Sequence, residues 1–246
     1  MNNIIEAINS KLDREVNLFN SEFETVLSRI EEMVSVRAAL SIRDPLEFDF
    51  VFNQILDESG YYDLINDFID NSYDKTYKEL LEAFEEGGLN IAFSENDLQS
   101  IREIKELDIQ AFRDIGVRAS QNLKRDLYKY SLSNISTKDL IANIKDSLKD
   151  TDLVKYAKTY ANTSIAEFNQ KIIDLKAQDA DGVWIYVGVE DKVTRDYCQN
   201  ILDDMKYYNT SEKNKLQNDK RRKWNCRHQF LLVSKEYAEQ RGYNAS

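Results

Sequence analysis

The sequence predicts a mainly α protein, with an elongated helical N-terminal region over residues 1–180 and a small α+β C-terminal module over residues 181–246. Three observations support this. One proline and seven glycines in 246 residues leave few positions that break a helix. Apolar residues recur three or four positions apart through most of residues 1–180, which is the period of a helix. After Gly182 a short β-branched and aromatic run replaces that spacing, as is typical of a strand.

The longest predicted helix covers residues 3–40. Its apolar residues form one narrow stripe: Ile4, Ile8, Leu12, Val16, Phe19, Phe23, Leu27, Ile30 and Val34. At 1.5 Å per residue this helix is about 55 Å long. Two interpretations are open: a helix packed in a bundle, or a coiled-coil or docking helix for another subunit.

Turn and cap residues divide the rest of the helical region. Asp44-Pro45 ends the first helix, because the residue before a proline is disfavoured in helical geometry. A short helix from Phe48 to Leu56 stops at Ser59-Gly60, and a helix over residues 61–84 ends at Gly87-Gly88.

Side-chain caps predict where the later helices begin. Ser94 with Asp97 resembles a capping box and opens a helix to about Ser131, in which Gly116 is a candidate kink. Ser136 with Asp139 is a second such box. Thr151-Asp152 caps a further helix, whose apolar positions continue to Ile172.

The C-terminal module alternates short strands and helices. Thr194 is expected near the cap of its first helix and Thr210-Ser211 at the cap of its second. The predicted elements are a strand over 183–189, a helix over 194–202, a strand over 206–208, a helix over 210–220 and a strand over 227–234.

Charge is distributed unevenly along the chain. Residues 1–180 carry 21 Lys and Arg against 34 Asp and Glu, whereas residues 181–246 carry 12 against 10. The N-terminal region therefore lacks the basic face that duplex DNA binding requires. No apolar stretch approaches the ~18–20 residues of a membrane span, and the first residues do not resemble a signal peptide, so we expect a protein of the cytosol or one assembled from it.

Both cysteines and the only histidine lie within 31 residues of each other. Cys198, Cys226 and His228 are residue types that bind zinc, and Asp191 is a candidate fourth ligand. The spacing of Cys226 and His228 places both side chains on one face of a strand. Three interpretations stay open: a structural zinc site, buried thiols beside a hydrogen-bonded histidine, and a disulfide.

The motifs of residues 155–235 resemble the C-terminal domain of phage head morphogenesis proteins, also called minor head or Mu F-like proteins. The resemblance lies in the order and spacing of four pieces: Thr163-Ser164 with Asn169, the strand with Trp184, Asp191-Lys192-Val193-Thr194-Arg195-Asp196-Tyr197-Cys198, and Asn225-Cys226-Arg227-His228. No motif of the preceding helical region matches this family.

This resemblance implies a structural, non-catalytic minor capsid protein of a tailed bacteriophage virion, assembled in the host cytoplasm. Its partners would be the portal and major capsid proteins. We expect a homo-oligomer or several copies in each phage head, and no membrane partner. The competing class is an enzyme, either a metal-dependent nuclease that uses His228 and Asp191 or a cysteine hydrolase that uses Cys198 or Cys226 with His228.

Two charged features have structural and functional interpretations. Asp191 and Arg195 are expected to form an ion pair that fixes the turn before Cys198, and Arg227 is a candidate member of the same network. The single basic run of the chain is a solvated loop, a contact for an acidic protein partner, or a non-specific contact with packaged DNA. Its residues are Lys213, Lys215, Lys220, Arg221, Arg222, Lys223 and Arg227.

Overall fold

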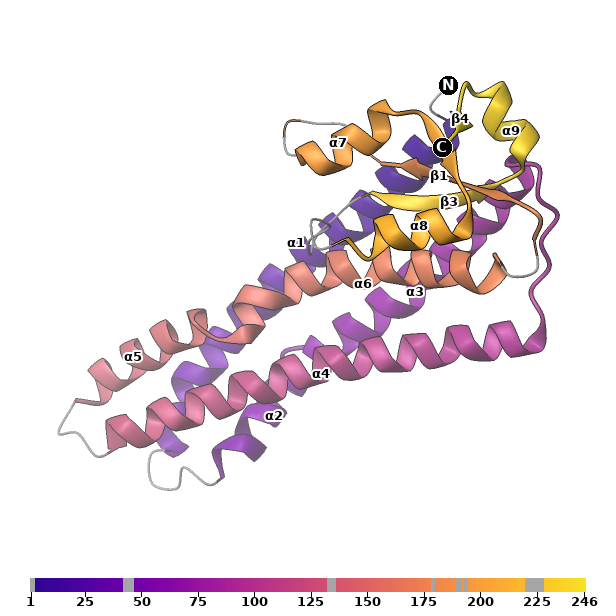
Figure 1. The fold of residues 1–246 in the computed structure, drawn as a ribbon. Coiled ribbons are helices and arrows are strands. Elements are labelled where there is room, and N and C mark those ends of the chain that lie inside the picture. The colour runs from indigo at the N-terminus through magenta and orange to yellow at the C-terminus, as the bar shows by residue number, and fades with distance from the viewer. Residues whose placement is uncertain are drawn as a thin grey trace. The chain divides into compact units, whose positions relative to one another are not determined.

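The computed structural model describes residues 3–41, 47–131, 136–177, 180–188, 192, 194–219 and 228–246. Long helices form the first part of the chain, and a four-stranded sheet with short helices follows, which confirms the predicted fold class (Figure 1). The helices of the first part are α1 (Asn3–Ser41), α2 (Phe48–Glu58), α3 (Tyr61–Glu86), α4 (Glu95–Ser131), α5 (Thr137–Lys149) and α6 (Asp152–Lys176).

The C-terminal elements follow the predicted order and add two at the end. They are β1 (Val183–Val187), α7 (Asp196–Asp203), β2 (Lys206–Tyr208), α8 (Thr210–Gln217), β3 (Gln229–Val233), α9 (Lys235–Gln240) and β4 (Asn244–Ala245). The sequence analysis missed α9 and β4, because elements of six and two residues are too short to show a period.

The predicted capping box at Ser94 is confirmed, and at Ser136 the side-chain cap of α5 is confirmed without the reciprocal backbone bond of a full box. The Ser94 N–H donates to Asp97 Oδ2 at 2.7 Å, and the Asp97 N–H donates to Ser94 Oγ at 3.3 Å. Ser136 Oγ likewise accepts from the Asp139 N–H at 3.1 Å. Gly116 does not interrupt α4; a Cβ there would lie 2.8 Å from Leu56 Cδ1, so this glycine permits close packing of α2.

The predicted cap at Thr210-Ser211 was wrong, whereas Thr194 lies near the cap of its helix as expected. Asn209, one residue before Thr210, caps α8 through a capping box with Glu212. Arg195 holds the N-cap position of α7 without a side-chain cap bond, so Thr194 lies one residue before the cap. Thr151 precedes α6, but its hydroxyl donates to the Leu148 carbonyl oxygen at 2.7 Å.

The chain divides into two compact units. The helical unit comprises Val16–Asp70 and Lys105–Ala161, and the sheet-containing unit comprises Met1–Glu15, Asn71–Ile104 and Asn162–Ser246. The domain boundary that the sequence suggests between residues 180 and 181 stays a prediction.

An aromatic cluster forms the core of the helical unit. The Phe19 ring lies 4.5 Å from that of Phe68 and 5.7 Å from that of Phe112, measured between centroids. The buried Tyr61 hydroxyl donates to the Phe112 carbonyl oxygen at 2.8 Å, and burial raises the pKa of Tyr61 far above its ordinary value. Rings from α1, α3 and α4 thus fill one interior, where their large apolar surfaces are removed from water.

The sheet has the strand order β3-β1-β2-β4. β1 pairs antiparallel with β3 and with β2, whereas β4 pairs parallel with β2. Because side chains alternate between the faces of a strand, the register gives one face a continuous set of large residues. These are Trp184, Tyr186, Tyr208, Phe230 and Leu232.

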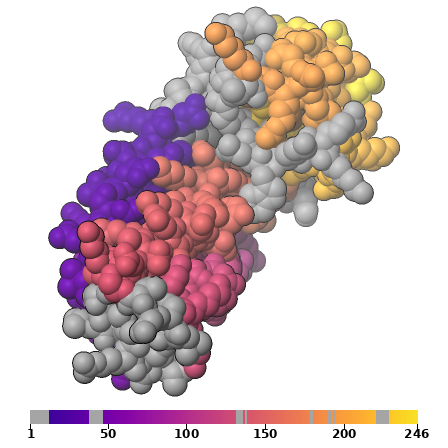
Figure 2. Space-filling view, turned by 90° about the vertical axis from the view of Figure 1, so that its left-hand side faces the viewer, coloured from indigo at the N-terminus to yellow at the C-terminus, as the bar shows by residue number. Residues whose placement is uncertain are grey.

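The outer edge of β3 is covered by other parts of the same unit. Gln170 Oε1 on α6 accepts from the Phe230 N–H at 3.1 Å, and the Gly87 carbonyl oxygen accepts from the Ser234 N–H at 2.9 Å. Figure 2 shows the orange and yellow atoms of the C-terminal segments lying against one another.

Within the described ranges, no helix combines the length and the apolar character that crossing a bilayer requires.

Candidate functional site

The candidate site is a buried group of Tyr186, Cys198 and His228, called here the Cys–Tyr–His cluster. Tyr186 lies on β1, Cys198 on α7, and His228 directly before β3. Antiparallel pairing of Val187 with Gln229 sets His228 opposite Gly188, the residue that follows β1. A Cβ on Gly188 would overlap the imidazole carbons of His228, so the absent side chain makes room for this ring.

Tyr186 contacts both other members of the cluster. Its hydroxyl donates to Cys198 Sγ at 3.4 Å, and its ring stacks on the His228 imidazole with centroids 5.8 Å apart and planes 16° apart. Phe230 packs beside Tyr186 at 4.8 Å. The cluster therefore sits at one end of the large-residue face of the sheet.

The cluster is closed to solvent. Cys198 is 1% exposed, Tyr186 3% and His228 4%. A thiol nucleophile must reach its substrate, and a basic imidazole must contact the thiol that it activates. The arrangement holds three elements of the module together, and it gives a substrate no direct access to Cys198.

The described part of the chain contains no group of three or more His, Cys, Asp or Glu side chains placed to hold a metal ion. Cys226 and Asp191 lie outside the described residues, so the zinc interpretation with Cys198, Cys226 and His228 stays a prediction. Asn225 and Arg227, and the expected pair between Asp191 and Arg195, also fall outside what the structure describes.

Trp184 anchors α8 to the sheet. Its buried indole N–H donates to Thr210 Oγ1 at 3.2 Å, and Lys213 Nζ lies 4.5 Å from the centre of its ring. Lys213 also pairs with Asp174 of α6 at 2.5 Å, and its side chain is only 3% exposed. A buried cation held by a carboxylate and an aromatic face connects α8, α6 and the sheet.

This position of Lys213 corrects the composition of the predicted basic patch. Lys213 points inward and is not part of an exposed basic surface, whereas Lys215 is exposed on the outer side of α8. Lys220, Arg221, Arg222 and Lys223 lie outside the described residues. Spacing alone did not distinguish Lys213 from Lys215, because α8 has few apolar residues that would mark its inner face.

Polar residues of α6 also belong to this site. The sequence analysis named Asn169 only within the phage-like motifs, and it did not name Gln170 or Asp174. Gln170 donates through Nε2 to Asp174 Oδ1 at 3.1 Å while its Oε1 covers the edge of β3. Asn169 is fully buried, and neither polar atom of its amide has a hydrogen-bond partner among the described residues. The sequence feature that could have indicated this contact is the spacing of Gln170 and Asp174, which are four positions apart and therefore neighbours on one helix face.

Two titratable groups near α8, Tyr208 and Glu212, have shifted pKa values. Burial, with Asp204 and Glu212 nearby, raises the pKa of Tyr208 to about 12. The N–H of Asn209 donates to the Glu212 carboxylate and lowers its pKa. At neutral pH this end of the module therefore holds a neutral tyrosine beside an ionised capping residue.

Comparisons of the chain with protein-family models, with curated proteins and with solved structures find no match. The proposal for its function therefore rests on its own residues and on the resemblance of its motifs.

Proposed function

We propose that this chain is a structural minor head protein of a tailed bacteriophage, associated with the portal and capsid and acting in head assembly. The observation that carries the proposal is the closed Cys–Tyr–His cluster, in which residues of the phage-like motifs make internal contacts. Tyr186 of the tryptophan strand binds Cys198 of the Thr-Arg-Cys piece and stacks on His228 of the Asn-Cys-Arg-His piece. Because these motif residues contact one another inside the module, they favour a rigid docking module over a reaction centre.

Trp184 supports the same role. It lies inside the module, where it binds Thr210 and Lys213 and connects the sheet to α6 through Asp174. The motif tryptophan therefore secures the module against the end of a long helix. A compact module secured by internal contacts suits a protein that joins larger assemblies.

The experiment that tests the proposal counts the copies of this chain in assembled phage heads. Quantitative mass spectrometry of purified heads, with labelled peptides of this chain and of the portal as standards, should find a few copies of this chain per portal ring. Particle maps should place it beside the portal or on the inner capsid surface. Complete heads that contain no copy of this chain would overturn the proposal.

A second measurement distinguishes an enzyme from a structural head protein. We expect His228→Ala protein that still folds to be incorporated into heads and to leave packaging intact, because the histidine acts in packing. If heads form normally but lose a nuclease or hydrolase activity with the imidazole, the chain is an enzyme.

A further inference from the structure

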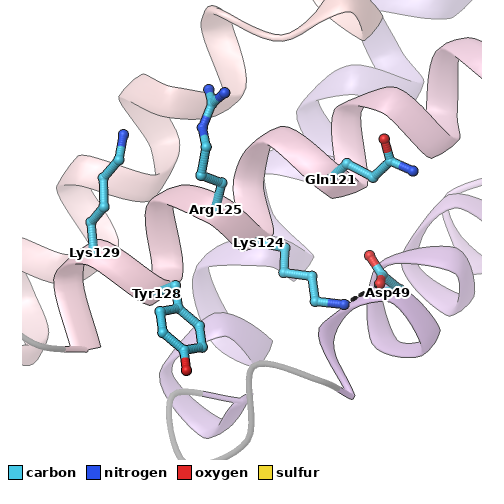
Figure 3. A pocket seen from close by; sticks show the side chains of 6 residues that line it. All are labelled: Asp49, Gln121, Lys124, Arg125, Tyr128 and Lys129. Atoms are coloured by element: carbon cyan, nitrogen blue, oxygen red, sulfur yellow. Dashed lines mark hydrogen bonds and ion pairs between the residues drawn. The ribbon is translucent and has the colours of Figure 1, made fainter.

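The outward face of α4 carries a protruding leucine and a hollow on the same helix. Leu107 is 67% exposed. The hollow encloses about 560 Å³ and is lined by Asp49, Gln121, Lys124, Arg125, Tyr128 and Lys129 (Figure 3). Leu107 and Arg125 are 18 residues apart, which is about five turns at 3.6 residues per turn, so both lie on one face of the helix.

The hollow combines carbon walls with a cationic rim. Figure 3 shows Arg125 and Lys129 extending to one side of α4, and Tyr128 and Lys124 to the other, where Lys124 contacts Asp49. The stems of the basic side chains and the exposed Tyr128 ring present apolar surface, while their charged ends stay in water. Such a hollow fits an apolar side chain that has a carboxylate next to it.

The same helix displays such a side chain. Glu106 precedes Leu107 and is exposed, and its carboxylate forms no ion pair within the described residues. Leu107 and the hollow are arranged symmetrically about residue 116. Asp114 and Arg118 lie at equal distances from that point and carry opposite charges.

We propose that the partner of this face is a second copy of the chain, docked with its α4 antiparallel to the first about a two-fold axis near residue 116. Each Leu107 then enters the hollow of the other copy, and each Glu106 meets the other copy's Lys124. Asp114 of each copy faces Arg118 of the other. A two-fold contact repeats every such pair in both directions, which is how a surface complements itself.

Charge distinguishes a second copy from nucleic acid on this face. Lys124, Arg125 and Lys129 attract phosphate, but Asp49, Glu106 and Asp114 share the surface, and the chain as a whole has a net charge of −11. A phosphate backbone would approach carboxylates at both ends of the contact. An antiparallel copy instead places the acidic end against the basic end twice.

The contact predicts a weak, concentration-dependent dimer. From Glu106 to Arg125 the face is about 30 Å long at 1.5 Å per residue, and a single helix is about 10 Å wide. That footprint is well below the ~800 Å² per partner of a standard stable interface. We therefore expect monomer at low micromolar concentration and dimer toward the millimolar range. This inference does not depend on the proposed role in phage heads.

Sedimentation equilibrium of the full chain over that concentration range tests the proposal. Leu107→Lys should weaken dimerisation about tenfold or more, because it places a cation in a hollow rimmed by Lys124, Arg125 and Lys129 and removes a buried leucine. Leu18→Lys is the matched control: Leu18 is 52% exposed on α1 in the same unit, and its substitution should leave the dissociation constant unchanged. Circular dichroism confirms that both variants fold.

Charge exchange identifies the pairing. Glu106→Lys and Lys124→Glu should each weaken the dimer, because each sets like charges opposite one another twice. The double variant Glu106→Lys/Lys124→Glu should recover association, and an equimolar mixture of the two single variants should form a heterodimer. A wild-type chain that stays monomeric at every concentration overturns the proposal. So does equal weakening by Leu18→Lys and Leu107→Lys, or a double variant no better than the single ones.

Discussion

The imidazole of His228 occupies the space that a side chain at position 188 would need. A Cβ on Gly188 would overlap two carbons of that ring and lie 3.0 Å from the His228 Cα. The two residues are 40 positions apart in sequence and meet because β1 pairs with β3. Gly188 is thus required by a long-range contact that places His228 against Tyr186.

We predict that Gly188→Ala lowers the free energy of unfolding by about 1–3 kcal/mol, since the added methyl group must displace a buried ring. Thermal unfolding measures the change. The control is the same substitution in a His228→Ala background, where the ring is gone and the added penalty should shrink. An equal penalty in both backgrounds would show that the methyl group meets something other than the imidazole.

Asn169→Leu is predicted to leave stability unchanged or raise it by about 1 kcal/mol. The buried Asn169 amide has no hydrogen-bond partner among the described residues, and leucine has nearly the same size without the cost of burying polar atoms. Urea unfolding gives the free energy, and Gln170→Leu is the contrasting variant, because it removes the bond to the Phe230 N–H. A loss above about 2 kcal/mol for Asn169→Leu would mean that the amide binds a buried water.

Asp97 is predicted to make stability depend on acid. Lys176, together with Ser94, lowers the pKa of Asp97 from 3.8 to about 2. A carboxyl whose pKa is lower in the folded state stabilises the fold above its unfolded pKa, and this contribution is lost as pH falls through the folded value. Wild type should therefore exceed Asp97→Asn in unfolding free energy at neutral pH, and the difference should fall between about pH 4 and pH 2.

Urea titrations of both proteins across that pH range measure the difference. At neutral pH we expect it to be about 3 kcal/mol, since the substitution leaves the buried Lys176 ammonium without its carboxylate. The pH interval is the specific part of the prediction. A difference that stays constant down to pH 2 would exclude ionised Asp97 as its source.

Lys213→Met is predicted to destabilise the protein by about 1–2 kcal/mol. Methionine keeps much of the apolar stem but loses the ion pair with Asp174 and the contact with the Trp184 ring. Lys215→Met on the same helix is the matched control and should change stability by less than about 0.5 kcal/mol, because Lys215 is exposed. Differential scanning calorimetry compares the two, and equal effects would place Lys213 on the surface.

The sequence by itself determined the helices of the first part of the chain and the order of most strands and helices in the module. Apolar spacing and the side-chain caps at Ser94 and Ser136 depend on residues three or four positions apart, which meet in any helix whatever the rest of the chain does. The prediction of a cap residue was wrong where two neighbouring polar residues could both cap the helix, as Asn209 and Thr210 could at the start of α8.

Only the tertiary structure decided which residues of distant elements meet. Lys213 and Asp174 are 39 positions apart, Lys176 and Asp97 are 79 apart, and the sequence analysis predicted neither pair. Strand pairing decided that His228 faces Gly188 and stacks on Tyr186. Spacing along one helix or strand determines on which face a side chain lies. Which residue packs against that face depends on how distant segments pair and pack in the folded chain.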